Sequence, residues 1–258
     1  MKKKQLLATL VMLSLMQGSV YAETVNTTLG EGTFIYNEDT TLKAGLSLTG
    51  EKQTIITVKD GTGTLTFDGG SRGIDMSSNK PEVTINANVV FTNQTWDGIN
   101  FNTGDEQIVK INGNLDFENM SVSAVKGQNG ASAEGTGLVV DGKITADNVN
   151  VKSGADGAIF AFYGTNVEAK GLEVKNSSLN KSDYGGVIFL NSSARINIKN
   201  DQGNAELKIS NIENNTTSLI TGIYGNTSNT YADKIIIENI DNNNGKSAMA
   251  ISIVDKIL

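Results

Sequence analysis

The stretch VTINANVVFTN, residues 83–93, is followed by two close copies of itself. These are VKINGNLDFEN at 109–119 and LVVDGKITADN at 138–148, so the copies begin 26 and then 29 residues apart. In each copy apolar and polar residues alternate, which is typical of a β-strand with one buried face. A strand repeated at this spacing predicts a solenoid, in which each repeat stacks on the previous one and shares its core.

Each copy ends in an asparagine, and looser copies later in the chain end in the same way. The steps between these terminal asparagines are 26, 29, 28, 35 and 28 residues, and we expect the longest step to hold an inserted loop near residues 199–204. Their parity predicts that the side chains point inward at a bend, where a buried amide must be hydrogen-bonded. Two interpretations are open: the amides stack from coil to coil as a ladder, or asparagine simply tolerates a left-handed turn. The residues are Asn93, Asn119, Asn148, Asn176, Asn211 and Asn239.

Further apolar segments lie between the asparagines, for example at Gly98–Phe101, Ala158–Phe162 and Gly186–Leu190. Each repeat therefore holds at least two strands separated by polar turns. We predict an all-β fold, a parallel β-helix of about 25–29 residues per coil. Because alternation alone does not define strand direction, an antiparallel β-sandwich is the alternative.

The first residues have the features of a bacterial export signal. Lys2, Lys3 and Lys4 precede an apolar run from Leu6 to Met16, and small residues flank a cleavage point between Ala22 and Glu23. A membrane anchor is the alternative, but the run is shorter than the roughly 20 residues of a spanning helix. We predict a signal peptide at 1–22, an N-terminal cap with its first strands at 23–60, and β-helix repeats at 61–258.

Composition excludes several functions. The net charge is −7 and there is neither histidine nor cysteine, so a basic face for nucleic acid, a Ser-His-Asp triad, disulfides and thiolate metal sites are not expected. The acidic residues recur about once per coil, mostly in turns, and are interpreted as turn and solvation chemistry rather than a catalytic pair. No catalytic residue, metal ligand or cofactor is predicted. The residues concerned are Asp68, Asp75, Asp97, Asp116, Asp141, Asp147, Asp156 and Asp183.

Aromatic residues near the predicted turns offer the one candidate ligand site. Exposed aromatic rings can stack on ligands such as sugars, whereas buried ones only fill the core. The favoured candidates are Trp96, Tyr163, Tyr184 and Tyr224, and Phe162 and Tyr231 have similar positions.

The leader, the cysteine-free repeat rich in Asn, Gly and Thr, and the acidic balance together resemble the N-terminal passenger of an autotransporter, a type V secreted adhesin. The resemblance covers essentially residues 1–258 and rests on composition and repeat pattern. It implies a right-handed parallel β-helix at the outer membrane or cell surface, acting in adhesion or aggregation. The implied partner is a host or bacterial surface ligand, either glycan or protein.

Autotransporters end in a membrane β-barrel of about a dozen strands that translocates the passenger. Here the sequence stops at Leu258, after an apolar strand. We therefore expect a reading frame truncated before its translocator barrel. The alternative functions are a secreted polysaccharide lyase or hydrolase of the parallel β-helix type, and a structural stalk.

Overall fold

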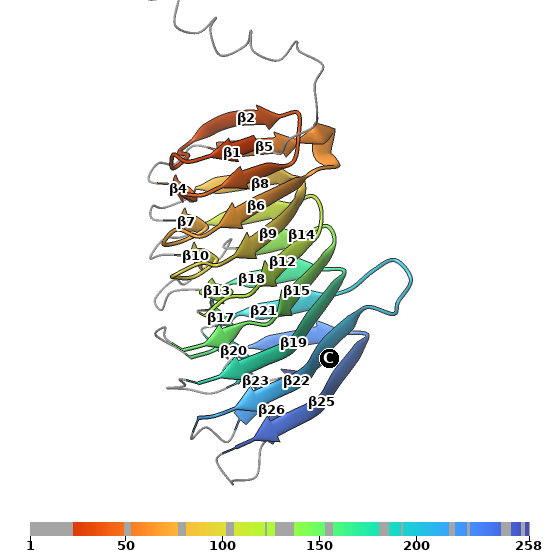
Figure 1. The fold of residues 1–258 in the computed structure, drawn as a ribbon. Coiled ribbons are helices and arrows are strands. Elements are labelled where there is room, and N and C mark those ends of the chain that lie inside the picture. The colour runs from red at the N-terminus through yellow and green to blue at the C-terminus, as the bar shows by residue number, and fades with distance from the viewer. Residues whose placement is uncertain are drawn as a thin grey trace, which may run out of the picture.

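Parallel β-strands make up nearly all of the regular structure in the computed structural model of the chain (Figure 1). One short 3-10 turn, Lys59–Gly61, is the exception within the described residues. These are residues 23–48, 53–76, 81–101, 106–121, 123–126, 137–152, 157–180, 186–191, 193–216, 220–225, 228–243, 249–253 and 256–257. Neighbouring strands pair in parallel throughout this part of the chain, which confirms the predicted β-solenoid and overturns the antiparallel sandwich.

The strands form three sheets, A, B and C, in each of which neighbouring strands are hydrogen-bonded. Over the described residues sheet A holds, in order of pairing, β1 (Glu23–Val25), β3 (Thr40–Leu42), β6 (Thr64–Asp68), β9 (Asn88–Thr92), β12 (Leu115–Glu118), β15 (Lys143–Asp147), β19 (Gly171–Leu179), β22 (Glu206–Asn214) and β25 (Lys234–Asn242), with β16 (Asn150–Val151) also paired to β19. Sheet B holds β4 (Leu46–Leu48), β7 (Ile74–Met76), β10 (Ile99–Phe101), β13 (Val125–Lys126), β17 (Phe160–Tyr163), β20 (Ile188–Asn191), β23 (Ile220–Gly225) and β26 (Met249–Ile253). Sheet C holds β2 (Gly32–Tyr36), β5 (Gln53–Val58), β8 (Glu82–Asn86), β11 (Ile108–Ile111), β14 (Gly137–Val140), β18 (Asn166–Ala169), β21 (Arg195–Ile198), β24 (Asn229–Ala232) and β27 (Lys256–Ile257).

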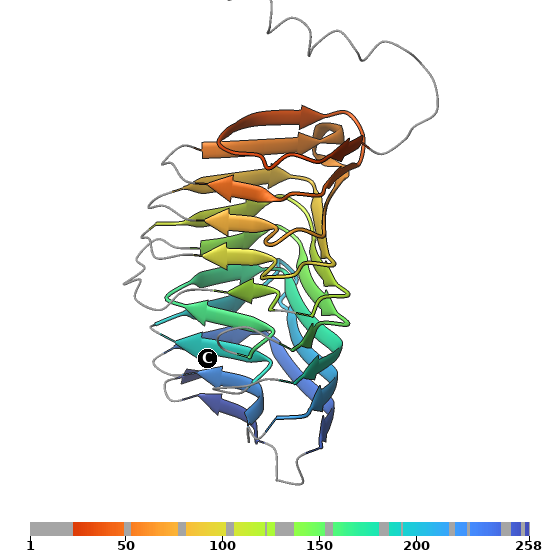
Figure 2. The ribbon, with the colours of Figure 1, turned by 60° about the vertical axis from the view of Figure 1, so that its left-hand side comes forward.

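Each coil contributes one strand to sheet C, then to sheet A, then to sheet B. In Figure 1 the strands of sheet A run leftward in front and those of sheet C run rightward behind while the chain descends, so the winding is right-handed. Figure 2 shows the flat stacking of the coils from another side. The three sequence copies lie directly on one another, with Val83 beside Val109 and Val109 beside Leu138. The repeat seen in the sequence is therefore the coil of the solenoid.

A column of phenylalanine rings fills the N-terminal half of the core. Phe67, Phe91 and Phe117 are in register on sheet A, fully buried, and stacked with ring centroids 4.7 and 5.1 Å apart. Glycines make room for these rings: a Cβ at Gly73 would lie 2.2 Å from the Phe91 ring, and one at Gly98 would lie 2.8 Å from the Phe117 ring. Large and small residues thus alternate across the core, as close packing requires.

The strands before residue 61 join the same three sheets. β2 pairs with β5, β3 with β6 and β4 with β7, so these early strands already belong to the same stack as the later coils. Glu23, the predicted first residue after cleavage, begins β1, and the predicted leader at 1–22 lies outside the described residues. Within the described part, no helix has the length and apolar character needed to cross a membrane.

The predicted inserted loop lies between β21 and β22 and projects from the solenoid (Figure 1). The Asn200 side chain holds this loop together. Its Oδ1 accepts hydrogen bonds from the backbone N–H groups of Gln202 and Asn204 at 3.0 and 3.3 Å, and its Nδ2 donates to Asn204 Oδ1 at 2.9 Å. The loop therefore accounts for the longest step between terminal asparagines.

Candidate functional site

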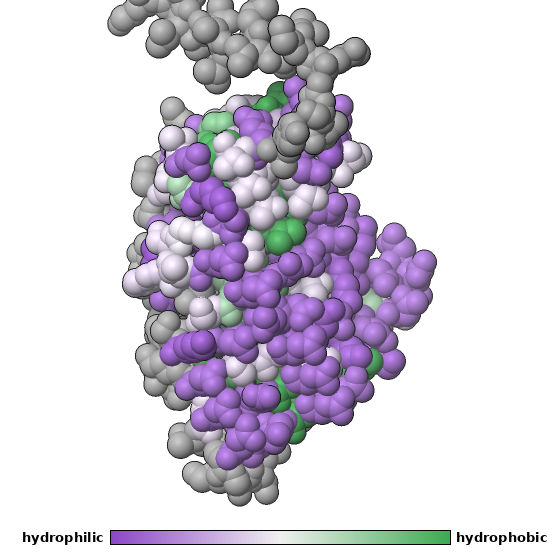
Figure 3. All heavy atoms as spheres, in the orientation of Figure 1, coloured by the Kyte–Doolittle hydropathy of each residue, from purple (hydrophilic) through white to green (hydrophobic). Residues whose placement is uncertain are grey.

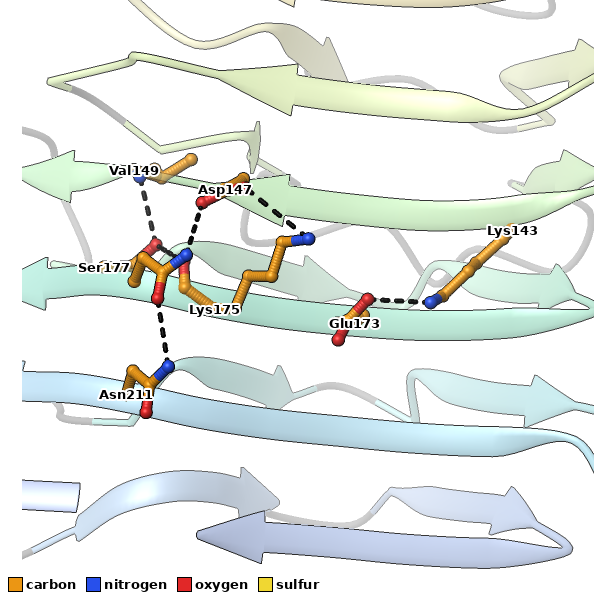
Figure 4. A network of polar contacts seen from close by, with 8 residues as sticks. Lys143, Asp147, Val149, Glu173, Lys175, Ser177 and Asn211 are labelled. Carbon is orange, nitrogen blue, oxygen red and sulfur yellow. Dashed lines mark hydrogen bonds and ion pairs between the residues drawn. The ribbon is translucent and has the colours of Figure 1, made fainter. Parts of the chain in front are cut away.

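The outer face of sheet A is polar over most of its area (Figure 3). Its lysines and glutamates form ion pairs between neighbouring coils, including Lys143–Glu173 at 2.7 Å and Lys208–Glu238 at 2.8 Å. Lys175 and Asp147 form a further pair at 3.5 Å, beside Lys143 and Glu173 (Figure 4). Exposed pairs of this kind contribute little to stability one by one. They do satisfy the charges of this face within the protein.

Two of these pairs shift the pKa of one partner each. The hydrogen bond from Lys143 lowers the pKa of the Glu173 carboxyl, and the hydrogen bond to Glu238 raises the pKa of the Lys208 ammonium. Asp68 has a lowered pKa because Asn93, and then Lys43, donate hydrogen bonds to its carboxylate. The pKa of Asp116 moves the other way, because burial disfavours its charged form more than a hydrogen bond from Thr145 and the nearby lysines favour it.

Replacing Asp116 with asparagine is expected to stabilise the protein at neutral pH. The pKa of Asp116 is higher in the folded protein than in the unfolded chain, where it is about 3.9. Ionisation of this carboxyl therefore lowers the stability of the folded protein as pH rises from the unfolded pKa through the folded one. The D116N variant removes the half-buried charge, so its thermal midpoint should rise by about 2 °C at pH 7, and the gain should disappear near pH 3. Differential scanning calorimetry at both pH values measures this. D141N is the control and should give no gain, because Lys170 lowers the pKa of Asp141.

The terminal asparagines form one corner of sheet A. Asn93, Asn119 and Asn148 directly follow β9, β12 and β15, whereas Asn176, Asn211 and Asn239 lie within β19, β22 and β25. All six have positive φ, from 49° to 56°, which is the left-handed conformation, and all are exposed. The inward orientation expected from parity is wrong because the left-handed residue shifts the alternation. In the coil of Asn93, both Thr92 and Asn93 face outward and Gln94 is the next buried residue.

The amides of this corner also bond between coils. Asn148 donates to Asn119 at 2.8 Å, Asn211 to Asn176 at 3.0 Å, and Asn239 to Asn211 at 3.1 Å. Asn176 donates to Asp147 at 3.0 Å and Asn93 to Asp68 at 2.8 Å, so carboxylates replace amides at two steps. Figure 4 shows the corner around Asp147, Ser177 and Asn211. Left-handed geometry and coil-to-coil hydrogen bonding therefore occur together at this corner.

Two substitutions of Asn176 separate these contributions. Asn176→Ala loses the amide bonds and places a Cβ-bearing residue without a polar side chain in the left-handed region, so it should cost about 2 kcal/mol. Asn176→Gly keeps the backbone conformation and loses only the amide bonds, so it should cost about 1 kcal/mol or less. Urea unfolding of both variants gives the two values. Equal costs would show that the left-handed conformation contributes nothing.

The aromatic candidates have different environments. Trp96 is 56 % exposed, and the Arg72 guanidinium carbon lies 5.1 Å from its ring centroid. Tyr163 is only 6 % exposed and its ring lies 5.4 Å from that of Phe189, so it is not presented to a ligand, and Phe162 is fully buried. Tyr184 and the side chain of Tyr224 lie outside the described residues. Tyr231 is 40 % exposed on sheet C.

The acidic residues do not gather into one cluster. Asp75 accepts hydrogen bonds from Arg72 at 3.1 Å and from Asn100 at 2.7 Å, whereas Asp141 pairs with Lys170 at 2.7 Å on another face. Asp156 and Asp183 lie outside the described residues. Among the residues that the structure describes, no group of three or more His, Cys, Asp or Glu side chains is placed to hold a metal ion.

A shallow hollow of 340 Å³ lies on the outer face of sheet C, over β18, β21 and β24. Its outward side chains form two rows of three that are set by strand register. Asn166, Arg195 and Asn229 are paired in one row, and Glu168, Asn197 and Tyr231 in the other. We call these six residues the sheet C array.

A second hollow of 530 Å³ lies where the loop at 199–205 meets sheet A. Gly142 and Gly171, in successive coils, leave its floor without side chains. Lys143 and Lys170 flank it, and each already pairs with a carboxylate, Glu173 and Asp141 respectively. Its charged groups are therefore engaged within the protein.

Sequence reasoning included Tyr231 only as a minor candidate and did not connect it with Arg195. These residues are 36 positions apart, and the inserted loop between them hides their alignment. No protein-family model, no curated protein and no solved structure matches the chain. The structural class of the protein is therefore defined by its fold alone, which is a three-sided parallel β-solenoid.

Proposed function

We propose that the chain is a non-catalytic passenger exported to the bacterial cell surface, where it acts in adhesion or aggregation. The carrying observation is the repetition of polar outer side chains from coil to coil along sheets A and C. Such a face suits contact with an extended glycan or protein surface, whereas small substrates are usually enclosed in a pocket. The predicted export signal and the resemblance of the sequence to autotransporter passengers support the cell-surface location.

The arrangement of charges supports binding over catalysis. A glycoside hydrolase needs two carboxyl groups facing each other across the scissile bond. Here the described carboxylates mostly pair with lysines or amides of neighbouring coils, for example Glu206 with Lys234 at 2.9 Å and Asp147 with Lys175 at 3.5 Å. The two hollows described above lie over different strands and have different linings.

Adherence assays test this proposal in a strain that carries the intact gene, in its deletion mutant and in the complemented mutant. We expect antibodies to label the chain on intact cells, and deletion to reduce adherence to host cells or autoaggregation at least several-fold. A surface-labelled chain whose deletion changes neither property would favour the stalk. Release of new reducing ends from polysaccharides by the purified chain would favour the enzyme.

A further inference from the structure

The sheet C array differs from the rest of the polar surface because its side chains are not paired with one another. Asn166, Glu168, Arg195, Asn197 and Asn229 make no side-chain hydrogen bond or ion pair with the described residues. On sheet A, in contrast, lysines and glutamates pair across coils, and the corner asparagines bond to one another. The array therefore presents unused donors and acceptors in one place.

Strand register fixes the spacing of these groups. Neighbouring coils are about 4.8 Å apart, and residues two apart on a strand are separated by about 6.6 Å. Arg195 is paired with Asn229, so Tyr231 lies diagonally from it, one coil on and two residues along. Diagonal neighbours of this kind lie about 7–8 Å apart, within reach of one another through long side chains. The guanidinium and the phenol ring can therefore contact a single small ligand together.

The chemistry of the two residues defines that ligand. A guanidinium without an internal partner offers a planar fork of N–H donors that matches a carboxylate. Tyr231 is 40 % exposed, and its hydroxyl donates to Asp233 Oδ1 at 3.3 Å, while Asp233 Oδ2 accepts the Ala205 N–H at 2.8 Å. This anchors the polar end of the ring and leaves part of the aromatic surface exposed.

We propose that the sheet C array binds an acidic saccharide. The sugar carboxylate contacts Arg195, the sugar ring stacks on Tyr231, and hydroxyl groups hydrogen-bond to Asn197, Asn229 and Glu168. The hollow of 340 Å³ is at the lower end of the about 300–1,000 Å³ found for ligand pockets, which suits one terminal sugar of a larger glycan. This assignment rests on the proposed adhesive function and gives it a ligand class.

The test begins with a glycan array that presents sialylated, glucuronate-containing and neutral glycans to the purified chain. Titration calorimetry then measures the affinity for sialyllactose and for a hyaluronan hexasaccharide, with lactose as the neutral comparison. The variants are R195M, R195K, Y231A and Y231F. K234M is the matched control, because it removes an exposed lysine of sheet A, outside the array. Thermal midpoints within about 2 °C of the parent establish that each variant is folded.

We expect at least one acidic glycan to bind and lactose not to bind. R195M should weaken this binding at least about 10-fold, and R195K should weaken it less, because a lysine keeps the charge but loses the fork. Y231A should weaken it about 5-fold or more, Y231F should bind within about 2-fold of the parent, and K234M should bind unchanged. Higher salt should weaken glycan binding by the parent chain. The effect of salt should be smaller for R195M, because this variant lacks the guanidinium charge.

Other results overturn the assignment. If R195M and Y231A still bind acidic glycans as the parent does, the ligand lies outside the sheet C array. If the chain binds only neutral glycans, or no glycan, the assignment of an acidic saccharide as the ligand is wrong. In each case, adherence that still depends on the gene leaves the proposed function intact. If deletion of the gene changes neither adherence nor autoaggregation, and the chain binds no glycan, both proposals are overturned.

Discussion

Replacing Phe91 with alanine is expected to lower the free energy of unfolding by about 3–5 kcal/mol. The Phe91 side chain is fully buried between Phe67 and Phe117, at ring-centroid distances of 4.7 and 5.1 Å. The substitution removes the middle ring of the column and leaves a cavity that two flanking rings and the backbone of neighbouring coils cannot close. Loss of two stacking contacts adds to the loss of buried apolar area.

Because each coil contacts mainly its neighbours, the effect of Phe91→Ala should be local. Hydrogen exchange measured by mass spectrometry should increase in β6, β9 and β12 and change little in β22 and β25. Val90→Ala, on the outward side of the same strand, is the control and should cost about 1 kcal/mol or less. Uniformly faster exchange along the whole chain would contradict the nearest-neighbour account.

The substitution Gly113→Ala is expected to destabilise the protein by about 3 kcal/mol, or to prevent folding of the coils around it. A Cβ at Gly113 would lie 2.3 Å from the Ala87 carbonyl oxygen and 2.9 Å from the Asn88 nitrogen. Both are backbone atoms of the coil before, so relief requires moving one coil relative to the next. The same contact recurs one coil later, where a Cβ at Gly142 would lie 2.6 Å from the Gly113 oxygen.

Gly137→Ala is the matched control for this prediction. Gly137 begins β14 of sheet C, and its added Cβ would approach nothing closer than the Asn166 oxygen at 3.4 Å. Chemical denaturation should therefore show a change of less than about 1 kcal/mol for Gly137→Ala. Similar costs for the two variants would mean that the close approach at Gly113 is relieved without strain.

The fold was predictable because the deciding information is local and repeated. Period-two alternation identifies the strands, and the copies at 83–93, 109–119 and 138–148 place Val83, Val109 and Leu138 in one column, as the register confirms. Parity failed at the asparagine corner. The asparagines mark the left-handed positions, but counting alternate residues does not show that each of them shifts the alternation by one position.

The surface was harder to predict because burial of an outward-facing residue depends on what covers it. Tyr163 stands on the outer side of sheet B, where parity suggests exposure, yet it packs against Phe189 and is buried. Trp96 remains exposed because it lies in a turn. The pairing that brings Arg195 next to Asn229, and diagonal to Tyr231, spans the loop at 199–205, and repeat counting could not fix it across that insertion.

The direction of the backbone hydrogen bonds has a mechanical consequence. In this solenoid the strands run across the long axis, so the bonds between neighbouring coils point along it. A pull between the two ends loads successive rows of bonds in series, and each row opens as a unit while the rows beyond it remain closed. Each coil released would add roughly 90 Å of extended chain. A molecule stretched between two surfaces would therefore lengthen in discrete steps and absorb work at each one.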